Sequence, residues 1–128
     1  MVTSSSVQSF KPWFGAARVL AALTVVTVIL IFGTAGVLVQ DHQAEDLHGA
    51  GALLLHITSG LLTLALGYLA YRGRLAWTGV VVSAALFGLS FAQAAYGSSD
   101  SLNLHVPGAF LIGAGSVGLA TWLFIRTD

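Results

Sequence analysis

The sequence predicts an all-α protein, a four-helix transmembrane bundle with both termini in the cytoplasm. Its composition is the first reason: 56% of the 128 residues are hydrophobic and 8% are charged, whereas soluble domains average about 25% charged residues. The second is four apolar stretches of roughly 20 residues, the length that a helix needs to cross about 30 Å of hydrocarbon. These stretches are residues 19–39, 49–71, 75–96 and 105–125. The third is a one-sided distribution of positive charge.

None of the four stretches contains Asp, Glu, Lys or Arg. In lipid the backbone polar groups must be hydrogen-bonded within the protein, so each stretch is expected to be a helix. The first stretch is longer than the apolar core of a typical signal peptide, and we interpret it as a retained helix. The expected organisation is an N-terminal cytoplasmic segment, 1–14, followed by one transmembrane domain, 15–128.

All five cationic side chains fall in the N-terminal segment, in the connection between the second and third stretches, or near the C-terminus: Lys11, Arg18, Arg72, Arg74 and Arg126. The other two connections, 40–48 and 97–104, contain Asp and Glu but no Lys or Arg. The positive-inside rule therefore predicts cytoplasmic termini for a multi-pass protein of a prokaryotic plasma membrane. Membrane lipids are the expected surroundings, and the net charge of zero argues against a nucleic-acid partner.

Two segments of the chain resemble each other. Residues 47–62 and 104–119 align without gaps and are identical at seven of 16 positions, and both open on Leu-His-x-x-Gly-Ala. This indicates a two-hairpin internal repeat. The repeat places His48 and His105 at equivalent depth, at the outer ends of the second and fourth helices. In a four-helix bundle, two such helices can lie on opposite sides of the core with their histidines facing each other.

His48 and His105 are the leading candidate cofactor ligands. Either one alone could reach the lipid headgroups or help to cap its helix. As a repeat-related pair they suit the two axial positions of a heme iron, for which neutral imidazole is a good ligand. The outer end of a lipid-buried bundle also supplies an apolar interior for a porphyrin ring and a polar edge for its propionates. The expected cofactor is therefore heme b.

His56 lies eight residues beyond His48, roughly 12 Å deeper in the membrane. An ionisable residue at that depth is a candidate for function. It either lies beside the cofactor or is a neutral imidazole that hydrogen-bonds another helix. Its counterpart in the repeat is Gly113, so it lacks a matched second ligand, although a His56–His105 pair of ligands also stays open.

Two more polar residues have two interpretations each. Gln93, in the outer half of the third helix, either hydrogen-bonds another helix or contacts the cofactor. His42, in the first outer connection, is either solvated or part of a metal site with Glu45 and Asp46. The two acids also suit the first turn of a helix, where negative charge meets the positive end of the helix dipole.

Two motifs together resemble one four-helix half of the heme A synthase family: the Glu-x-x-His of Glu45 and His48, and the Leu-His-Val-Pro-Gly-Ala of residues 104–109. Members of that family have eight transmembrane helices in two halves, each with a histidine pair near the outer face. The resemblance implies that His48 and His105 ligate heme and that Glu45 matches the acid associated with catalysis. Family members usually have Arg after the first histidine, where this chain has Gly49. Because the chain supplies one half, a homodimer could rebuild the eight-helix form.

The expected function is heme binding for electron transfer or heme handling at the outer side of the membrane, together with a membrane redox partner. The enzymatic alternative is a dimeric oxidase similar to heme A synthase, which would need Glu45 for activity but not for heme binding. Another alternative is a cofactor-free subunit or assembly factor with structural histidines. The last is a copper or zinc site built from His42, His48, His105 and the loop acids, because imidazole suits several metals.

Overall fold

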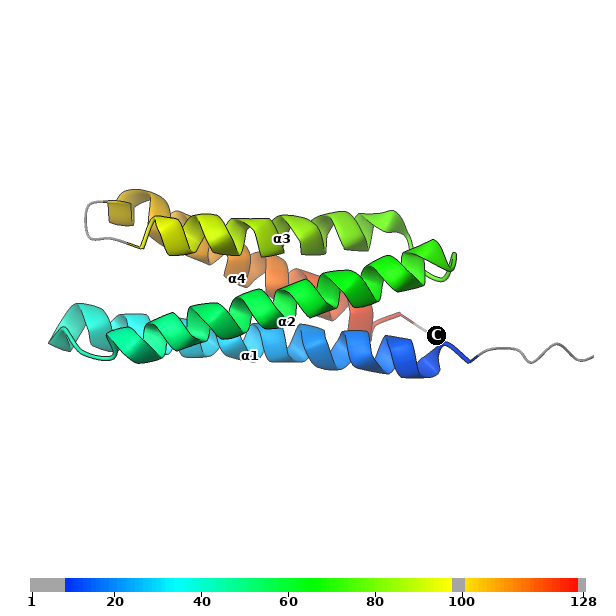
Figure 1. The fold of residues 1–128 in the computed structure, drawn as a ribbon, viewed down its shortest axis with the longest axis horizontal. Helices are drawn as coiled ribbons and strands as arrows, with labels where there is room; N and C mark the ends of the chain where they lie inside the picture. Colours follow the sequence, from blue (N-terminus) through cyan, green and yellow to red (C-terminus); the bar gives the residue numbers. More distant parts are fainter. Residues whose placement is uncertain (1–8, 98–100, 127–128) are drawn as a thin grey trace, which may run out of the picture.

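The computed structural model describes residues 9–97 and 101–126, and four α-helices account for nearly all of them. The helices are α1 (Lys11–Asp41), α2 (Glu45–Tyr71), α3 (Trp77–Ala95) and α4 (Leu102–Phe124). They run side by side along the long axis of the molecule (Figure 1). All four are long and apolar enough to span a membrane, as the sequence predicted.

Helices α1, α2 and α4 begin earlier than the apolar stretches that predicted them, because their first turns include polar residues or proline, whereas α3 begins two residues later than its stretch. Helix α1 begins at Lys11, inside the segment expected to precede the transmembrane domain, with Pro12 in its first turn. Proline suits that position because its missing N–H would have no partner there. Helix α2 begins at Glu45, and the carboxylates of Glu45 and Asp46 lie in its first turn, where they offset the positive end of the helix dipole.

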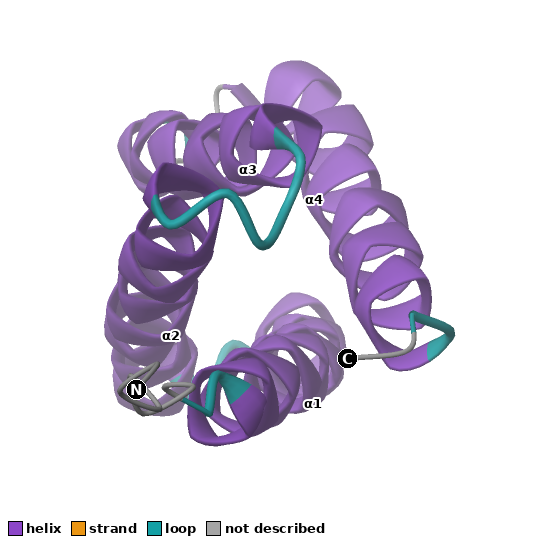
Figure 2. Cartoon of the chain, turned by 90° about the vertical axis from the view of Figure 1, so that its right-hand side faces the viewer, coloured by secondary structure: helices purple, strands orange, loops and turns teal. Residues whose placement is uncertain are grey.

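The four helices stand at the corners of a square in which each helix packs against two others (Figure 2). Within the described residues, α2 packs against α1 and α3, and α4 packs against α1 and α3, whereas α2 and α4 do not pack against each other. Helices α2 and α4 therefore lie across the diagonal of the bundle, and both run away from the α1–α2 connection. A side chain that reaches the centre from α2 can meet one from α4 without a helix between them.

The connection between α2 and α3 is a tight turn. Gly73 has a left-handed backbone, with φ +66°. Its N–H donates to the carbonyl of Ala70 at 2.9 Å, and the N–H of Arg74 donates to the carbonyl of Leu69 at 2.8 Å. This pair of bonds closes the C-terminus of α2 in the way that glycine favours. It makes α2 and α3 antiparallel neighbours.

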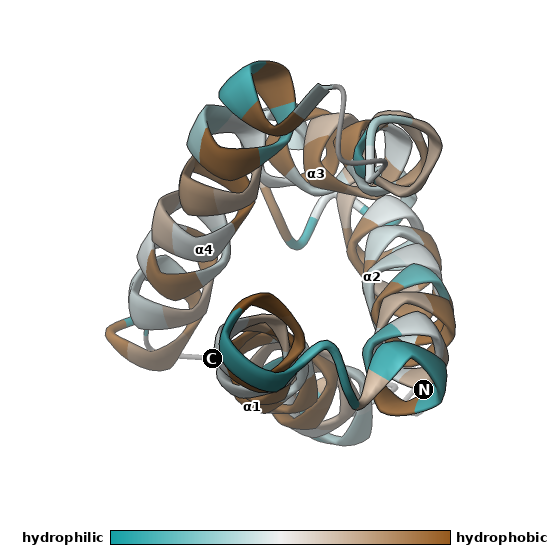
Figure 3. Cartoon of the chain, turned by 90° about the vertical axis from the view of Figure 1, so that its left-hand side faces the viewer, coloured by the Kyte–Doolittle hydropathy of each residue, from teal (hydrophilic) through white to brown (hydrophobic). Residues whose placement is uncertain are grey.

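Charge is separated between the two ends of the bundle. One end, called the basic end below, has the start of α1, the α2–α3 turn and the end of α4, and so holds all five cations (Figure 1). The opposite end, called the acidic end, holds the acids that the structure describes, Asp41, Glu45 and Asp46. Asp100 and Asp128 lie outside the described residues. Figure 3 looks onto the acidic end and shows hydrophilic residues at the near end of the bundle and hydrophobic residues further along the helices.

The outer surface of the bundle is apolar. Val39, Leu64 and Phe110, from three different helices, are 71%, 70% and 69% exposed. Large exposed hydrophobic side chains occur along all four helices. A water-soluble protein rarely exposes a contiguous apolar surface of this extent, so the surface suits a hydrocarbon solvent.

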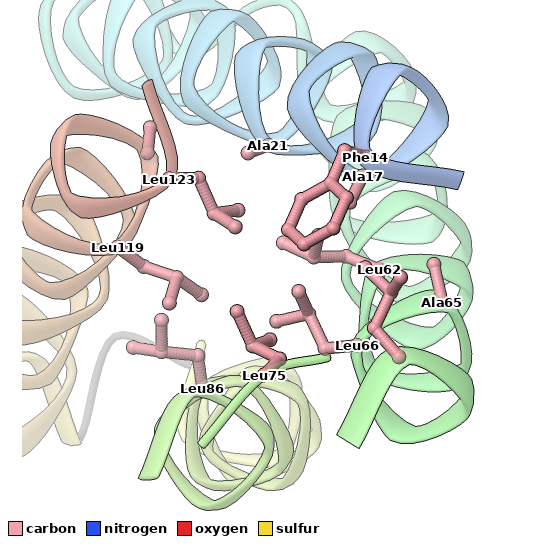
Figure 4. Packing of buried hydrophobic residues seen from close by; sticks show 12 residues of the cluster. Phe14, Ala17, Ala21, Leu62, Ala65, Leu66, Leu75, Leu86, Leu119 and Leu123 are labelled. Carbon is pink, nitrogen blue, oxygen red and sulfur yellow. The ribbon is translucent and has the colours of Figure 1, made fainter. Parts of the chain in front are cut away.

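The main hydrophobic core fills the half of the bundle next to the basic end. All four helices contribute to it, and Leu66, Leu69 and Leu123 are fully buried within it. Figure 4 shows Phe14, Leu62 and Leu75 pointing into the same space as Leu123. A smaller cluster of Val28, Leu55 and Ile112 lies closer to the acidic end. The interior is therefore packed most densely with large apolar side chains at the basic end.

We predict that Gly79→Ala destabilises the fold, because a Cβ at Gly79 would lie 2.6 Å from the Trp122 ring. The Trp122 ring is partly buried against the main core and cannot move away without losing contacts there, so the free energy of unfolding should fall by about 1–3 kcal/mol. Circular dichroism during unfolding in detergent would measure the change. Gly118→Ala is the matched control, since nothing lies within 4 Å of its Cβ position, and it should leave stability unchanged or raise it by up to about 1 kcal/mol. Equal stability of the two variants would contradict this packing.

Candidate functional site

The structure brings His48 and His105 together across the diagonal of the bundle. His48 lies in the first turn of α2 and His105 in the first turn of α4. Their ring centroids are 6.5 Å apart, with the two ring planes at 54°. Both side chains are half-buried. The two residues that the sequence paired through its internal similarity are thus neighbours in space, although 56 residues separate them in the chain.

The protonation of His105 follows from its partner. Its Nδ1 lies 3.0 Å from the backbone carbonyl oxygen of Gln93 on α3. A carbonyl oxygen only accepts, so Nδ1–H must donate, and Nε2 of the neutral ring then carries the free lone pair. This is the arrangement in which metal-bound histidines are usually found, with the second ring nitrogen held by a carbonyl or carboxylate.

His48 has the same tautomer for a related reason. Its Nδ1 lies 3.2 Å from Oγ1 of Thr34 on α1. The Thr34 hydroxyl proton has acceptors in its own helix, the carbonyls of Ile31 at 3.0 Å and Leu30 at 3.1 Å. When one of these carbonyls takes the hydroxyl proton, the hydroxyl oxygen accepts from Nδ1–H of His48, which gives this ring the same tautomer as His105. Thr34 carries no signal of this role in the sequence, because a threonine in an apolar span ordinarily bonds only its own helix.

The two Nε2 atoms are therefore the groups available to a metal. Neither ring makes any other hydrogen bond within the described residues. An iron bound to two imidazoles at about 2 Å from each nitrogen would place the ring centroids about 6 Å apart. The observed 6.5 Å is close to that value. The donor type and the centroid spacing are thus compatible with two imidazoles on one metal ion.

Small residues follow both histidines along their helices. Gly51 and Ala52 follow His48, and Gly108 and Ala109 follow His105. A Cβ at Gly51 would lie 2.8 Å from Cγ1 of Ile31 on α1, and a Cβ at Gly108 would overlap the Gln93 amide on α3. In each hairpin, therefore, the histidine bonds the preceding helix and the glycine three residues later accommodates a side chain from that helix. These are the His and Gly positions of the Leu-His-x-x-Gly-Ala motif that both segments share in the sequence.

Apolar side chains form the floor beneath the histidine pair. Leu55 and Ile112 each follow their histidine by seven residues, about 10 Å along the helix. Together with Val28 they form the smaller hydrophobic cluster, and all three are buried. The histidine pair is thus bounded on the side of the bundle interior by hydrocarbon, as the macrocycle of a porphyrin requires.

His56 lies at the α2–α3 contact, apart from the histidine pair. Its ring stacks on Phe91, with centroids 4.1 Å apart and planes at 10°. Its Nε2 is buried without a hydrogen-bond partner in the part of the chain that the structure describes. The interhelical hydrogen bond considered for His56 is therefore not seen at this nitrogen. His105 has His48 as its neighbour, which favours the His48–His105 pair over a His56–His105 pair.

Gln93 reaches the site through its backbone. Its carbonyl oxygen accepts from His105, while its side-chain amide lies against Gly108. The side-chain Oε1 is buried and has no partner among residues 9–97 and 101–126. Two buried polar atoms without partners, this oxygen and Nε2 of His56, thus lie deeper in the bundle than the histidine pair. Buried polar groups without partners are rare in protein interiors, and where one occurs it calls for an explanation, such as a bound ion, water or ligand.

The remaining candidates are at the surface of the acidic end. Glu45, Asp46 and His42 are exposed, and His42 ends α1 with a left-handed backbone at φ +54°. Among the described residues, no three His, Cys, Asp or Glu side chains are grouped to hold a metal ion. His42 and the two acids are therefore not assembled with the histidine pair into a larger donor set.

The chain was also compared with known proteins. No protein-family model, no curated protein and no solved structure matches it. The similarity to one half of a heme A synthase accordingly remains an expectation based on Glu45, His48 and His105.

Proposed function

We propose that this protein is an integral membrane protein that binds heme b between His48 and His105. The observation that carries the proposal is the 6.5 Å approach of two imidazoles whose Nδ1 atoms are both engaged with neighbouring helices. That combination leaves the Nε2 atom of each ring without a partner within the described residues, on two rings that face each other across the bundle. Electron transfer or heme handling is the function that such a site supports.

The residues of this chain would divide the work of holding the cofactor. His48 and His105 would supply the axial nitrogens, and Thr34 and the Gln93 carbonyl would orient the rings. Leu55, together with Ile112 and Val28, would keep water from the deeper edge of the ring. Bound heme supplies one-electron exchange between ferric and ferrous iron.

The site is expected to communicate with one side of the membrane. The dense core at the basic end separates it from that surface, whereas the first turns of α2 and α4 lead directly to the acidic end. With the positive-inside rule, the basic end and both termini are cytoplasmic and the heme lies near the outer surface. A redox partner would then approach from the acidic end or within the membrane.

The proposal also includes a two-hairpin repeat. Equivalent positions in the two hairpins make equivalent contacts: each histidine bonds the preceding helix, and Gly51 and Gly108 each accommodate a side chain from it. A repeat of this kind would explain why one ligand comes from each hairpin. Association of two such chains would give an eight-helix assembly similar to that of heme A synthases.

The first prediction concerns the absorption spectrum of protein purified in mild detergent. A Soret band that shifts on reduction is expected, and His48→Ala or His105→Ala should abolish it, because each variant removes an axial nitrogen. His42→Ala is the control and should keep the band, since His42 is exposed at the end of α1. A colourless protein that contains copper or zinc would contradict the proposal, as would loss of the band in His56→Ala but not in His48→Ala.

The second prediction concerns Thr34. Thr34→Val removes the acceptor of the His48 Nδ1–H bond at nearly constant volume, which makes His48 a weaker electron donor. The midpoint potential of the heme should therefore rise, by an amount on the order of tens of millivolts. A spectroscopic redox titration measures the shift. Thr121→Val is the matched control, because the exposed Thr121 hydroxyl bonds only the carbonyl of Val117 at 2.8 Å. Equal potentials in both variants would show that Thr34 does not orient a ligand.

The third prediction separates heme binding from heme modification. Glu45 is exposed, and no hydrogen bond joins it to either histidine within the described residues. We therefore expect Glu45→Gln to retain the Soret band, and heme extracted from both proteins to have the mass of unmodified heme b. A heme with an oxidised methyl group in the native protein, absent from Glu45→Gln, would instead establish the dimeric oxidase.

A further inference from the structure

The α2–α3 turn holds two guanidinium groups beside one aromatic ring. The Arg72 guanidinium carbon lies 5.3 Å from the centroid of the Phe10 ring, and that of Arg74 lies 4.9 Å from it. Both distances are within the range of a cation–π interaction. Phe10 itself immediately precedes α1. Three residues from two distant parts of the chain thus meet at the basic end.

The backbone of the turn fixes this arrangement. Gly73 separates the two arginines, and its left-handed φ of +66° reverses the chain between them. The hydrogen bond from the Arg74 N–H to Leu69 holds the turn closed. Arg72 is further positioned by a hydrogen bond of 3.2 Å that its Nη1 donates to the Tyr68 hydroxyl. The Tyr68 ring in turn packs against Trp13, with ring centroids 4.2 Å apart. Both arginines are therefore pre-oriented, although they remain exposed.

The position of the pair along the bundle identifies the surroundings of these charges. Arg72 and Arg74 come directly after the apolar span of α2 and before that of α3. Trp13 and Trp77, which are 41% and 59% exposed, begin α1 and α3 at the same end. Tryptophan at span ends is typical of the membrane–water interface. The guanidinium groups thus lie at the level where lipid phosphates are found.

We propose that Arg72 and Arg74, held beside Phe10, form a binding site for the phosphate group of an anionic glycerophospholipid. A guanidinium group matches phosphate oxygens with paired N–H donors. Two guanidinium groups beside one ring produce a local positive potential, which the negative charge of an anionic headgroup would offset. Basic residues at the ends of transmembrane helices recognise anionic lipids in this way. The proposal does not depend on heme binding.

The test is native mass spectrometry of the full chain in a neutral detergent. Phosphatidylglycerol and phosphatidylcholine with identical acyl chains are titrated separately, so that only the headgroup differs. Phosphatidylglycerol should bind more tightly, and the double variant Arg72→Gln/Arg74→Gln should weaken its binding about 25-fold, given about fivefold for each basic residue near an anionic surface. Binding of phosphatidylcholine should not change. Circular dichroism checks that the variant is folded.

Two controls make the result specific. Arg126→Gln removes one charge at the same end, but the Arg126 guanidinium lies beside the Trp122 ring of α4, 4.4 Å from its centroid, and not beside Phe10. It should therefore weaken binding much less than Arg74→Gln alone. Arg72→Lys/Arg74→Lys keeps both charges without the planar guanidinium and should lie between native protein and the glutamine variant. Equal affinity for the two lipids, or equal loss in Arg126→Gln and Arg74→Gln, would overturn the proposal. Displacement of the lipid by millimolar inorganic phosphate would also overturn it, by assigning the site to a free anion.

Discussion

The structure depends on one constraint: a chain with an apolar exterior must satisfy its backbone within its own helices. Four long helices meet that requirement, and as a result few polar groups are left to link one helix with another. Those few links therefore carry information. The bonds from His48 to Thr34 and from His105 to the Gln93 carbonyl each join the two helices of one hairpin at the acidic end. Thr63 and Ser83 join α2 to α3 through their hydroxyls, 2.8 Å apart, in the middle of the bundle.

These links explain why a histidine pair can lie in such a molecule at all. An unpaired imidazole N–H in an apolar interior is costly, and the preceding helix offsets that cost at both histidines. The same bonds leave each Nε2 without a partner within the described residues, which the proposed heme site requires. The Nδ1 hydrogen bonds therefore offset the cost of burying each imidazole and also orient each ring as the proposed heme site requires. His56 differs because its Nε2 has no partner among the described residues, and stacking on Phe91 is its main contact.

The two ends of the bundle have different physical characters. Around the basic end, large leucine and phenylalanine side chains pack between the helices, and the exposed arginines lie beside aromatic rings. Toward the acidic end, α2 and α4 carry glycine and alanine below their histidines, and the buried apolar cluster is small. Dense packing at the basic end suits a rigid part of the bundle, whereas small residues beside the histidines leave room for a cofactor. The proposed lipid contact and the proposed heme site follow this division.

The sequence by itself determined the four helices and the charge difference between the ends, because apolar length and the positions of Lys and Arg are local properties. It also indicated His48 and His105 as a pair through the repeated motif. Only the tertiary structure decided that their rings approach to 6.5 Å, which depends on α2 and α4 lying across the diagonal. It also decided that Thr34 and the backbone of Gln93 are the partners of the two Nδ1 atoms. A hydroxyl and a carbonyl are present in every such helix, and only the packing of one helix on another selects which of them a histidine meets.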